Sequence, residues 1–355
     1  MSVLILSLGT RGGSLVYAQE IIDRLNLNKT VIVSSNSLVK RPYFNRKWKT
    51  HRSLLEFIFL SLTVLPLYLI QITYELAINK YSVLYLPYIH FWSLFFIVLF
   101  KLFGKKTVIT IHDGVLHSKN GIPIIQIMIN RCILMADQLI FLSEYVKESV
   151  EKEIKPKGSA FVIPHGSIVP VGLSKVPRTY TEKPNLLFFG KVLPSKGVEN
   201  LVAAIEQISP NLYNQLLIVG KHYYDLNLKI NNSKIVVIDH FIPEDEIAIF
   251  FNQADILILP YIQASQSGVA TIGIAACLPI VATKTGGLTE QLEENKEGIF
   301  VESNPDSIAR GILTLINDKN LYETISKNLN NKIHNNMTWQ NISNLVAHVI
   351  QEAKS

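Results

Sequence analysis

Short runs of β-branched and other apolar residues alternate with longer amphipathic segments along most of the chain. The first half holds VLILSL, TVIVSS, VLYLPY and TVITIH, and the second half holds NLLFFG, QLLIVG, KIVVID, DILILPY, PIVAT and GIFV. This alternation is typical of βαβ units, in which helices join parallel strands. We therefore predict an α/β protein with doubly wound parallel sheets.

A proline-rich stretch separates the two series of strands. With 355 residues, the chain exceeds the roughly 100 to 200 residues of one domain. We predict two Rossmann-like domains at residues 1–165 and 184–336, joined by a linker at 166–183. The last segment, 337–355, is expected to form a helix that can pack back on the first domain.

The two cysteines, Cys132 and Cys277, cannot build a disulfide framework, and no Cys/His cluster has the spacing of a zinc site. The start, MSVLILSLGTRGGS, has no positive segment before its short apolar run. It is therefore expected to be a first strand, not a signal peptide. We expect a cytosolic, reduced protein that holds no metal.

The most apolar part of the chain lies between strands of the first half. Residues 57–74 contain no charge over 18 residues. A membrane span there would leave VLYLPY on the opposite side of the bilayer from VLILSL, so that one sheet could not form. Pro66 and Gln71 also argue against a span. Residues 90–103 are too short to span.

A basic surface accompanies these apolar segments. Residues 1–165 carry 19 Lys/Arg and 10 Asp/Glu, a net charge of +9, whereas the remaining residues carry −3. The segment 40–52 contains six Lys/Arg and no acid. It is compatible with anionic lipid, a phosphate-bearing substrate, nucleic acid or a merely solvated loop. We favour two helices lying on an anionic membrane over two buried core helices, because the apolar content exceeds what packing on one sheet face requires. The predicted membrane or acceptor surface comprises Lys40, Arg41, Arg46, Lys47, Trp48, Lys49 and Arg52.

Three segments have the composition of anion sites. GTRGGS places Gly9, Gly12 and Gly13 after the first strand, where backbone N–H groups can approach an anion. KVLPSKG places Lys191 and Lys196 after NLLFFG, which suits a diphosphate. QASQSG opens an apolar helix with small polar residues. The alternatives are a tight glycine turn, helix caps formed by Ser195, Ser265 or Ser267, and solvated lysines.

Together these motifs resemble a known family. FFGKVLPSKGVENLVAA, ADILILPY, PIVATKTGGLTE and GIFVESNPDSIARGI are similar to the donor-binding half of a GT-B glycosyltransferase of glycosyltransferase family 4. GTRGGS, TVITIHDG, LIFLSEYV and VIPHG follow the order of that family's first half. The resemblance implies two Rossmann-like domains that face a central cleft.

The resemblance also implies roles for individual residues. Lys191 stands where the family usually has arginine and Lys196 where it has its lysine, both facing the donor diphosphate, with Gly12 and Gly13 on the opposite domain. His112 matches the position whose imidazole approaches the donor sugar. Asp113 either orients His112 or caps the next segment.

One pair of family residues is absent. Ala264 and Ile272 occupy the positions of two glutamates that are separated by seven residues in many members. The stretch instead resembles a branch with a Gln-Ser-Gly signature. In that branch Gln266 and the backbone amides of Ser267, Gly268 and Val269 take the donor contacts, and Glu290 matches a family acid.

The implied reaction is a retaining sugar transfer from a nucleotide-diphosphate sugar, without a protein nucleophile. Lysines and helix N-termini stabilise the leaving diphosphate, so no metal cofactor is expected. No D-x-D pair occurs, and Glu244, Asp245 and Glu246 suit a helix N-terminus. The main hypothesis is an enzyme, peripheral to the inner face of the cytoplasmic membrane, that extends a lipid-linked saccharide for a surface polysaccharide such as O-antigen or capsule. Alternatives are a GT-B-type nucleotide-sugar epimerase and a non-catalytic sugar-nucleotide-binding or scaffold protein. No motif supports nucleic-acid binding.

Overall fold

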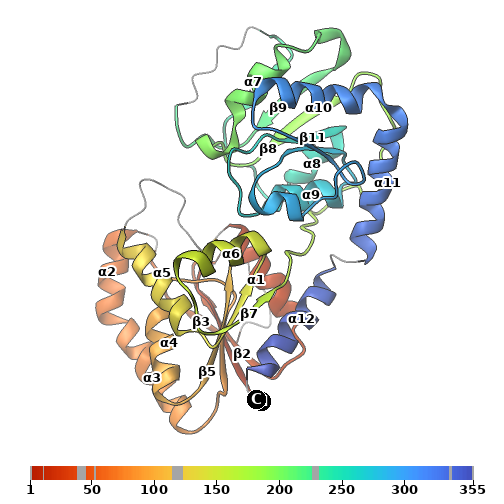
Figure 1. Cartoon of the computed structure of the whole chain (residues 1–355). Coiled ribbons are helices and arrows are strands. Elements are labelled where there is room, and N and C mark those ends of the chain that lie inside the picture. The colour runs from red at the N-terminus through yellow and green to blue at the C-terminus, as the bar shows by residue number, and fades with distance from the viewer. Residues whose placement is uncertain are drawn as a thin grey trace. The chain divides into compact units, whose positions relative to one another are not determined.

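Two parallel β-sheets organise the chain, as the alternating pattern predicts (Figure 1). The computed structural model describes residues 2–10, 12–37, 45–51, 53–113, 123–225, 232–335 and 338–353. The chain divides into two compact units. The first comprises Met1–His165 with Trp339–Ser355, and the second comprises Gly166–Thr338.

The first unit contains a seven-stranded sheet with the order β3-β2-β1-β4-β5-β6-β7. Its strands are β1 (Val3–Ser7), β2 (Lys29–Ser34), β3 (Arg46–Trp48), β4 (Val83–Leu86), β5 (Lys106–Ile111), β6 (Gln138–Phe141) and β7 (Ser159–Val162). Its helices are α1 (Gly13–Arg24), α2 (Leu54–Thr63), α3 (Leu65–Ala77), α4 (Ser93–Leu102), α5 (Pro123–Met135), α6 (Glu144–Glu153) and α12 (Trp339–Glu352). Strands β1 and β4 to β6 are buried along most of their length, as expected for a sheet with helices on both faces.

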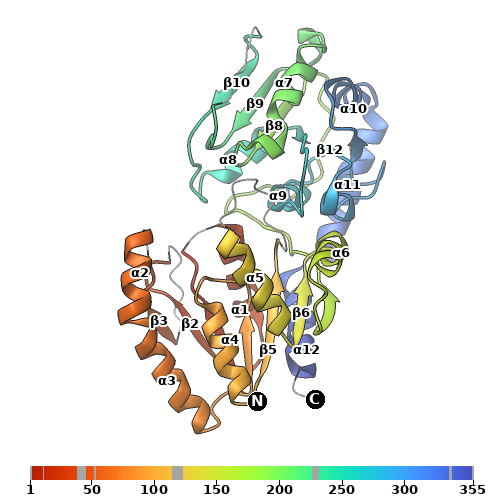
Figure 2. The same ribbon diagram turned by 60° about the vertical axis from the view of Figure 1, so that its left-hand side comes forward.

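The apolar segment at 57–74 forms parts of two helices and not the single helix predicted. Helices α2 and α3 meet at Val64 with a bend of 42°. Pro66 lies in the first turn of α3, where its missing N–H and fixed φ are tolerated. Figures 1 and 2 show the two helices following each other along one side of the first unit. Within the described ranges no single helix has the length and apolar character to cross a membrane, and the bent α2–α3 pair passes that test only jointly, by length and composition.

The second unit contains a six-stranded sheet with the order β10-β9-β8-β11-β12-β13. Its strands are β8 (Asn185–Phe189), β9 (Gln215–Val219), β10 (Ile235–Ile238), β11 (Ile256–Leu259), β12 (Ile280–Thr283) and β13 (Ile299–Val301). Its helices are α7 (Val198–Ile205), α8 (Ile247–Gln253), α9 (Gly268–Ala275), α10 (Pro305–Asn317) and α11 (Lys319–Asn335), with 3₁₀ helices η1 (Pro194–Lys196), η2 (Pro210–Leu212) and η3 (Gly286–Glu290).

The segment expected as a linker, 166–183, packs on the second unit. Its Arg178 guanidinium donates to the backbone oxygens of Phe251, Asn252 and Ala276 at 3.0 to 3.1 Å. These carbonyls end helices α8 and α9, where a cation is favourable. At the other end of the chain α12 packs on α1, and the Ser343 hydroxyl donates to the Ile21 oxygen at 3.2 Å.

Each sheet contains one point where the order of the strands reverses direction. In the first sheet it lies between β1 and β4, and in the second between β8 and β11. Open α/β sheets bind ligands beyond the carboxyl ends of the strands at such points. The loops that follow these four strands are therefore the first places to search for a site.

Candidate functional site

The glycine loop after β1 begins the site of the first unit. The Gly9 N–H donates to the Tyr88 hydroxyl at 2.6 Å, so this amide already has a partner. Gly12 caps α1 with a φ of 100°, a conformation that other residues rarely adopt. Gly13 begins the helix, and a Cβ at either Gly12 or Gly13 would meet no atom within 4 Å. Glycine at position 12 is thus required by backbone conformation.

His112 follows β5 and is fixed by the loop after β4. Its Nε2 lies 2.9 Å from the Pro87 carbonyl oxygen. Because a carbonyl only accepts hydrogen bonds, Nε2 carries the proton and Nδ1 is the acceptor nitrogen of the ring. Burial lowers the pKa of His112 below its usual range, and the Tyr17 ring packs edge-on at 4.9 Å. A neutral ring of this kind suits a sugar hydroxyl better than a phosphate. Asp113 is exposed beside it.

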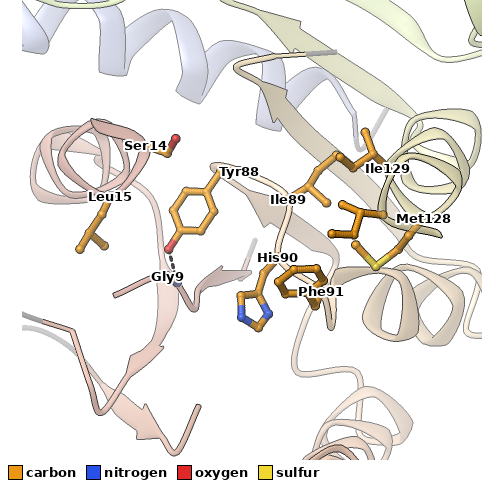
Figure 3. Close-up of a pocket in the computed structure, with 10 residues that line it drawn as sticks. Gly9, Ser14, Leu15, Tyr88, Ile89, His90, Phe91, Met128 and Ile129 are labelled. Carbon is orange, nitrogen blue, oxygen red and sulfur yellow. Dashed lines mark hydrogen bonds between the residues drawn. The ribbon is translucent and has the colours of Figure 1, made fainter. Parts of the chain in front are cut away.

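A pocket of about 290 Å³ lies between α1 and α5, against the loop that follows β4 (Figure 3). Tyr88 and His90 from this loop line it. Neither was predicted as a site residue, because Tyr88 ends the apolar run of a strand and His90 begins an apolar segment. Their position directly after a strand was the signal that could have identified them.

In the second unit, Lys196 is held at the reversal point of the sheet. Its Nζ lies 3.6 Å from the centroid of the Tyr261 ring, and Tyr261 follows β11. Gly197 adopts a φ of 63°, and a Cβ there would lie 2.1 Å from the Pro260 oxygen. The Ile262 N–H donates to the Ser195 oxygen at 2.9 Å. The loops after β8 and β11 are therefore joined, and glycine is required where they touch. Ser195 does not cap α7, whose N-cap is Gly197.

Lys191 occupies a more open position on the same loop. It is exposed, and its Nζ lies 5.9 Å from the centroid of the Tyr223 ring. Two ammonium groups thus follow β8, one half-buried and one exposed. Both follow the carboxyl end of this strand, as the sequence pattern predicts; their role toward a diphosphate stays a prediction.

The N-terminus of α9 is shaped by Ser267 and Gln291. The Ser267 hydroxyl caps the helix by accepting from the Ala270 N–H at 3.1 Å. The Ser267 N–H donates to Gln291 Oε1 at 2.8 Å, and Gln291 Nε2 donates to the Ser267 oxygen at 3.1 Å. This corrects one prediction, because the Ser267 amide already has a side-chain partner. The amides of Gly268 and Val269 are in the first turn, where a helix offers N–H groups to ligands.

The remaining predicted donor residues lie near this helix. Gln266 is half-buried directly before Ser267, and Glu290 is exposed at the end of η3, next to Gln291. Ala264 and Ile272, which replace the family glutamates, are each 5% exposed within the apolar core. A carboxylate at either position would be buried in that core. Gln291 was missed because its contact with α9 spans 24 residues.

The structure describes part of the predicted basic surface, and one of its residues is buried. Lys40, Arg41 and Arg52 lie outside the described residues, and Lys47 and Lys49 are exposed. Trp48, predicted for this surface, is buried and stacks on Tyr68 with ring centroids 4.1 Å apart. Arg46 pairs with Glu75 at 2.6 Å. Strand β3 points Trp48 into the core, which corrects its assignment.

No group of three potential metal-ligating His, Cys, Asp or Glu side chains occurs in the part of the chain that the structure describes. The acidic run Glu244, Asp245 and Glu246 directly precedes α8, where negative charge stabilises a helix N-terminus.

Comparisons with known proteins bear on the family and the fold. Residues 173–332 match the family described as "Glycosyl transferases group 1". An uncharacterized glycosyltransferase of Methanocaldococcus jannaschii is 30% identical over 197 residues, which cover 54% of this chain and 53% of that protein. A GDP-mannose-dependent alpha-(1-6)-phosphatidylinositol monomannoside mannosyltransferase of Mycobacterium tuberculosis is 24% identical over 241 residues, covering 62% and 63%. The matches thus span about half to three-fifths of these relatives.

A solved structure extends the likeness to both units. The crystal structure of Anabaena HepE in complex with UDP has a TM-score of 0.76 to this chain at 16% identity, covering 99% of this chain and 100% of that chain. This likeness concerns the fold. Residues 173–332 are therefore similar to the glycosyl transferases group 1 family, and the chain has the fold of GT-B glycosyltransferases.

Proposed function

We propose that this protein is a retaining glycosyltransferase of the family 4 type, in the branch with the Gln-Ser-Gly signature. It moves a sugar from a nucleotide-diphosphate sugar to a lipid-linked saccharide during surface polysaccharide synthesis. The observation that carries the proposal is the arrangement of Lys196, Tyr261 and the N-terminus of α9 within the group 1 domain. The UDP complex of the similarly folded HepE and the nucleotide-sugar donor of the mannosyltransferase relative support the donor class.

The second unit is proposed to bind the donor diphosphate. Negative charge gathers on the diphosphate as the glycosidic bond breaks. Lys191, Lys196 and the first-turn amides of α9 provide positive charge and N–H donors for it. Two ammonium groups can take the place of a divalent metal, so we propose a reaction that needs none.

His112 in the first unit is proposed to contact the donor sugar. The Pro87 carbonyl fixes its Nε2 proton, so Nδ1 can accept from a sugar hydroxyl. In a reaction that retains the anomeric configuration without a protein nucleophile, the acceptor attacks the anomeric carbon from the same face of the sugar from which the diphosphate leaves. The role of His112 is therefore to orient the sugar.

Membrane contact is proposed for an outward stripe of large apolar side chains on α2, α3 and α4, which we call the apolar surface. Within each helix these residues are three or four positions apart and so share one face. Leu55 is 81% exposed, Leu62 74% and Leu102 78%. Each helix also buries apolar residues on its inner side. The apolar surface comprises Leu55, Ile58, Phe59 and Leu62 of α2, Leu67, Ile70 and Tyr74 of α3, and Phe95, Val98 and Leu102 of α4.

The charge around these helices favours an anionic bilayer as the partner. Lys47 and Lys49 are exposed on the segment that leads into α2, and Lys105, shortly after α4, is half-buried. An exposed apolar stripe with flanking lysines is typical of a segment that lies on anionic lipid. The phosphatidylinositol monomannoside named for the M. tuberculosis relative supports a lipid-borne acceptor.

Donor binding and transfer are tested together. UDP, GDP, ADP and CMP are screened by thermal shift, since a ligand at 100 times its dissociation constant adds about 2.7 kcal/mol to stability. We expect one nucleoside diphosphate to stabilise the protein, Lys196→Ala to abolish the shift, and Lys183→Ala, a change of an exposed lysine in the same unit, to keep it. His112→Ala should keep the shift and lose transfer. Absence of any shift would overturn the proposal in favour of a scaffold, and donor turnover without acceptor would indicate an epimerase.

Membrane contact is tested by co-sedimentation with phosphatidylcholine vesicles, with and without phosphatidylglycerol. We expect binding that requires the anionic lipid and is lost in Phe59→Ser/Leu62→Ser. The control is Phe241→Ser, which changes a similarly exposed aromatic residue of the second unit. Equal sedimentation of both variants would contradict this surface. Concentration-dependent dimerisation lost in the double variant would assign it to a second copy of the chain.

A further inference from the structure

We propose that the pocket between α1 and α5 binds one uncharged sugar ring of the acceptor. This inference rests on the proposed glycosyltransferase function and specifies the chemistry of its second substrate. The pocket lies at the reversal point of the first sheet, since Gly9 follows β1 and Tyr88 follows β4. The same loop places Pro87, which holds His112. The pocket therefore adjoins His112, the residue proposed to contact the donor sugar.

The pocket has mostly apolar walls. Leu15 comes from α1, Ile89 and Phe91 from the loop after β4, and Met128 and Ile129 from α5 (Figure 3). Among the described residues that line it, none carries an Asp, Glu, Lys or Arg side chain. Phe91 also contacts Phe57 of α2, with ring centroids 5.4 Å apart. The pocket thus adjoins the helix that bears part of the apolar surface.

His90 is the polar group that most restricts the ligand. Its Nδ1 accepts the Trp92 N–H at 3.2 Å, so in the neutral ring Nε2 carries the proton and is a donor. Burial and the neighbouring His51 lower the pKa of His90 to about 3, which keeps it uncharged. The hydroxyl of Tyr88 is already bonded to Gly9 and Ser7. The pocket therefore offers hydrogen bonds but no cation.

This chemistry selects among the groups that a lipid-linked saccharide carries. A uronic carboxylate or a phosphate would lose its water here without gaining a counter-charge, which is costly. A lipid chain would leave the His90 N–H without an acceptor. A neutral sugar offers hydroxyl acceptors to His90 and C–H faces to Phe91 and Met128. The volume of about 290 Å³ is at the lower end for ligand pockets, so one ring is favoured over a longer chain.

The test uses saturation-transfer NMR with four methyl glycosides at millimolar concentration. Three are neutral, those of glucose, N-acetylglucosamine and rhamnose, and the fourth is that of glucuronic acid. We expect transfer to at least one neutral glycoside and none to the glucuronide. Met128→Trp fills the pocket and should remove the signal. Ile127→Trp, at an exposed neighbouring position on the same helix, should retain it.

A charge reversal makes the test sharper. Met128→Lys adds a cation to the wall and should shift binding from the neutral glycoside to the glucuronide. The inference would be overturned if the natural protein bound neutral and charged glycosides equally. It would also be overturned if no neutral glycoside gave a signal, or if the signal persisted in Met128→Trp. The nucleotide thermal shift on the same samples separates the two proposals and confirms that the variants are folded. If the nucleotide thermal shift is present but the glycoside signal is absent, only the proposal for this pocket is refuted. If the thermal shift and the glycoside signal are both absent, the proposed function fails as well.

Discussion

The ammonium group of Lys196 stands 3.6 Å from the centroid of the Tyr261 ring, and the hydroxyl of that ring lies 3.2 Å from the Ser267 hydroxyl. One buried tyrosine thereby connects the lysine after β8 with the cap of α9. Burial raises the pKa of Tyr261 to about 12, so the phenol stays protonated and can hydrogen-bond. A diphosphate at this point would be held by two elements whose spacing depends on Tyr261.

Replacing Tyr261 should weaken nucleotide binding without removing any group that touches the ligand. Tyr261→Leu removes the ring beneath Lys196, and a partly desolvated cation–π contact contributes about 1 to 2 kcal/mol, or roughly 5- to 30-fold in affinity. Tyr261→Phe keeps the ring and should lose less. Calorimetric titration with the stabilising nucleoside diphosphate measures both. Tyr223→Leu, beneath exposed Lys191, is the control, and equal losses at the two positions would contradict a special role for Tyr261.

Gln291 is expected to control the charge at the N-terminus of α9. Gln291→Glu keeps an acceptor for the Ser267 N–H, loses the donor to the Ser267 oxygen, and places a negative charge at the N-terminus of α9 that repels a phosphate. We expect nucleotide affinity to fall at least about tenfold, equivalent to 1.4 kcal/mol, while the protein stays folded. Gln253→Glu makes the same charge change at an exposed position of the second unit. If both variants bind nucleotide like the natural protein, α9 does not face the diphosphate.

The strands were predictable because alternation is a local pattern. Lys191, Lys196 and His112 were candidates because each follows a strand and matches a position of the family that the sequence resembles. Gln291 and Tyr88 escaped prediction because their partners are 24 and 79 residues away. Trp48 was misassigned because β3 has only three residues, too few to reveal inward and outward positions. The basic residues next to Trp48 in the sequence suggested a surface position, although its side chain is buried in the core. Local pattern thus predicted which loops follow the strands, whereas contacts between loops, which the sequence does not show, determine which of their polar atoms already have partners.

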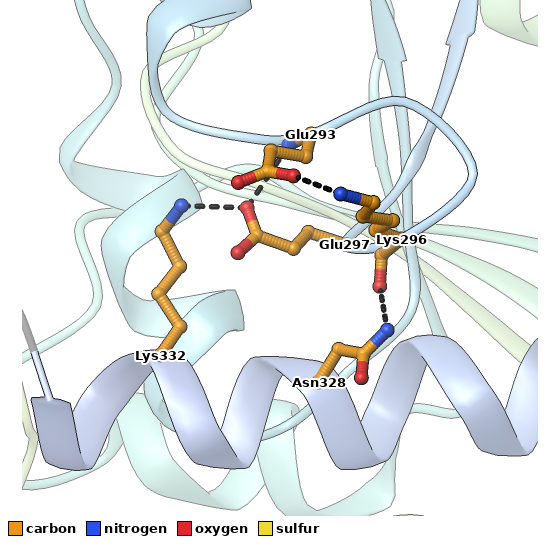
Figure 4. A network of polar contacts seen from close by, with 5 residues as sticks. All are labelled: Glu293, Lys296, Glu297, Asn328 and Lys332. Atoms are coloured by element: carbon orange, nitrogen blue, oxygen red, sulfur yellow. Dashed lines mark hydrogen bonds and ion pairs between the residues drawn. The ribbon is translucent and has the colours of Figure 1, made fainter.

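Lys332 should contribute strongly to the stability of the second unit. It pairs with Glu297 at 2.5 Å, and the same carboxylate oxygen accepts the Glu293 N–H at 2.9 Å (Figure 4). Lys332→Met would leave a nearly buried carboxylate without its counter-charge, at a cost of about 3 kcal/mol. Lys296→Met breaks the exposed pair with Glu293 and should cause no measurable loss. Urea unfolding compares the two, and similar midpoints would show that the Glu297 pair is not stabilising.

His90 should make the protein less stable in acid. Its folded pKa of about 3 lies below the value of about 6.5 for an unfolded chain. Between these values only the unfolded state binds the proton, so stability decreases as the pH falls from about 6.5, by at most about 1.4 kcal/mol per pH unit for this group. Above about pH 6.5 the ionisation of His90 does not change the stability, because the ring is neutral in both the folded and the unfolded state. In His90→Asn, Oδ1 can still accept the Trp92 N–H but does not titrate. Urea unfolding at pH 7 and pH 5 should therefore show a smaller loss for the variant than for the natural protein. Equal losses would mean that water reaches the imidazole and that the pocket wall can become charged.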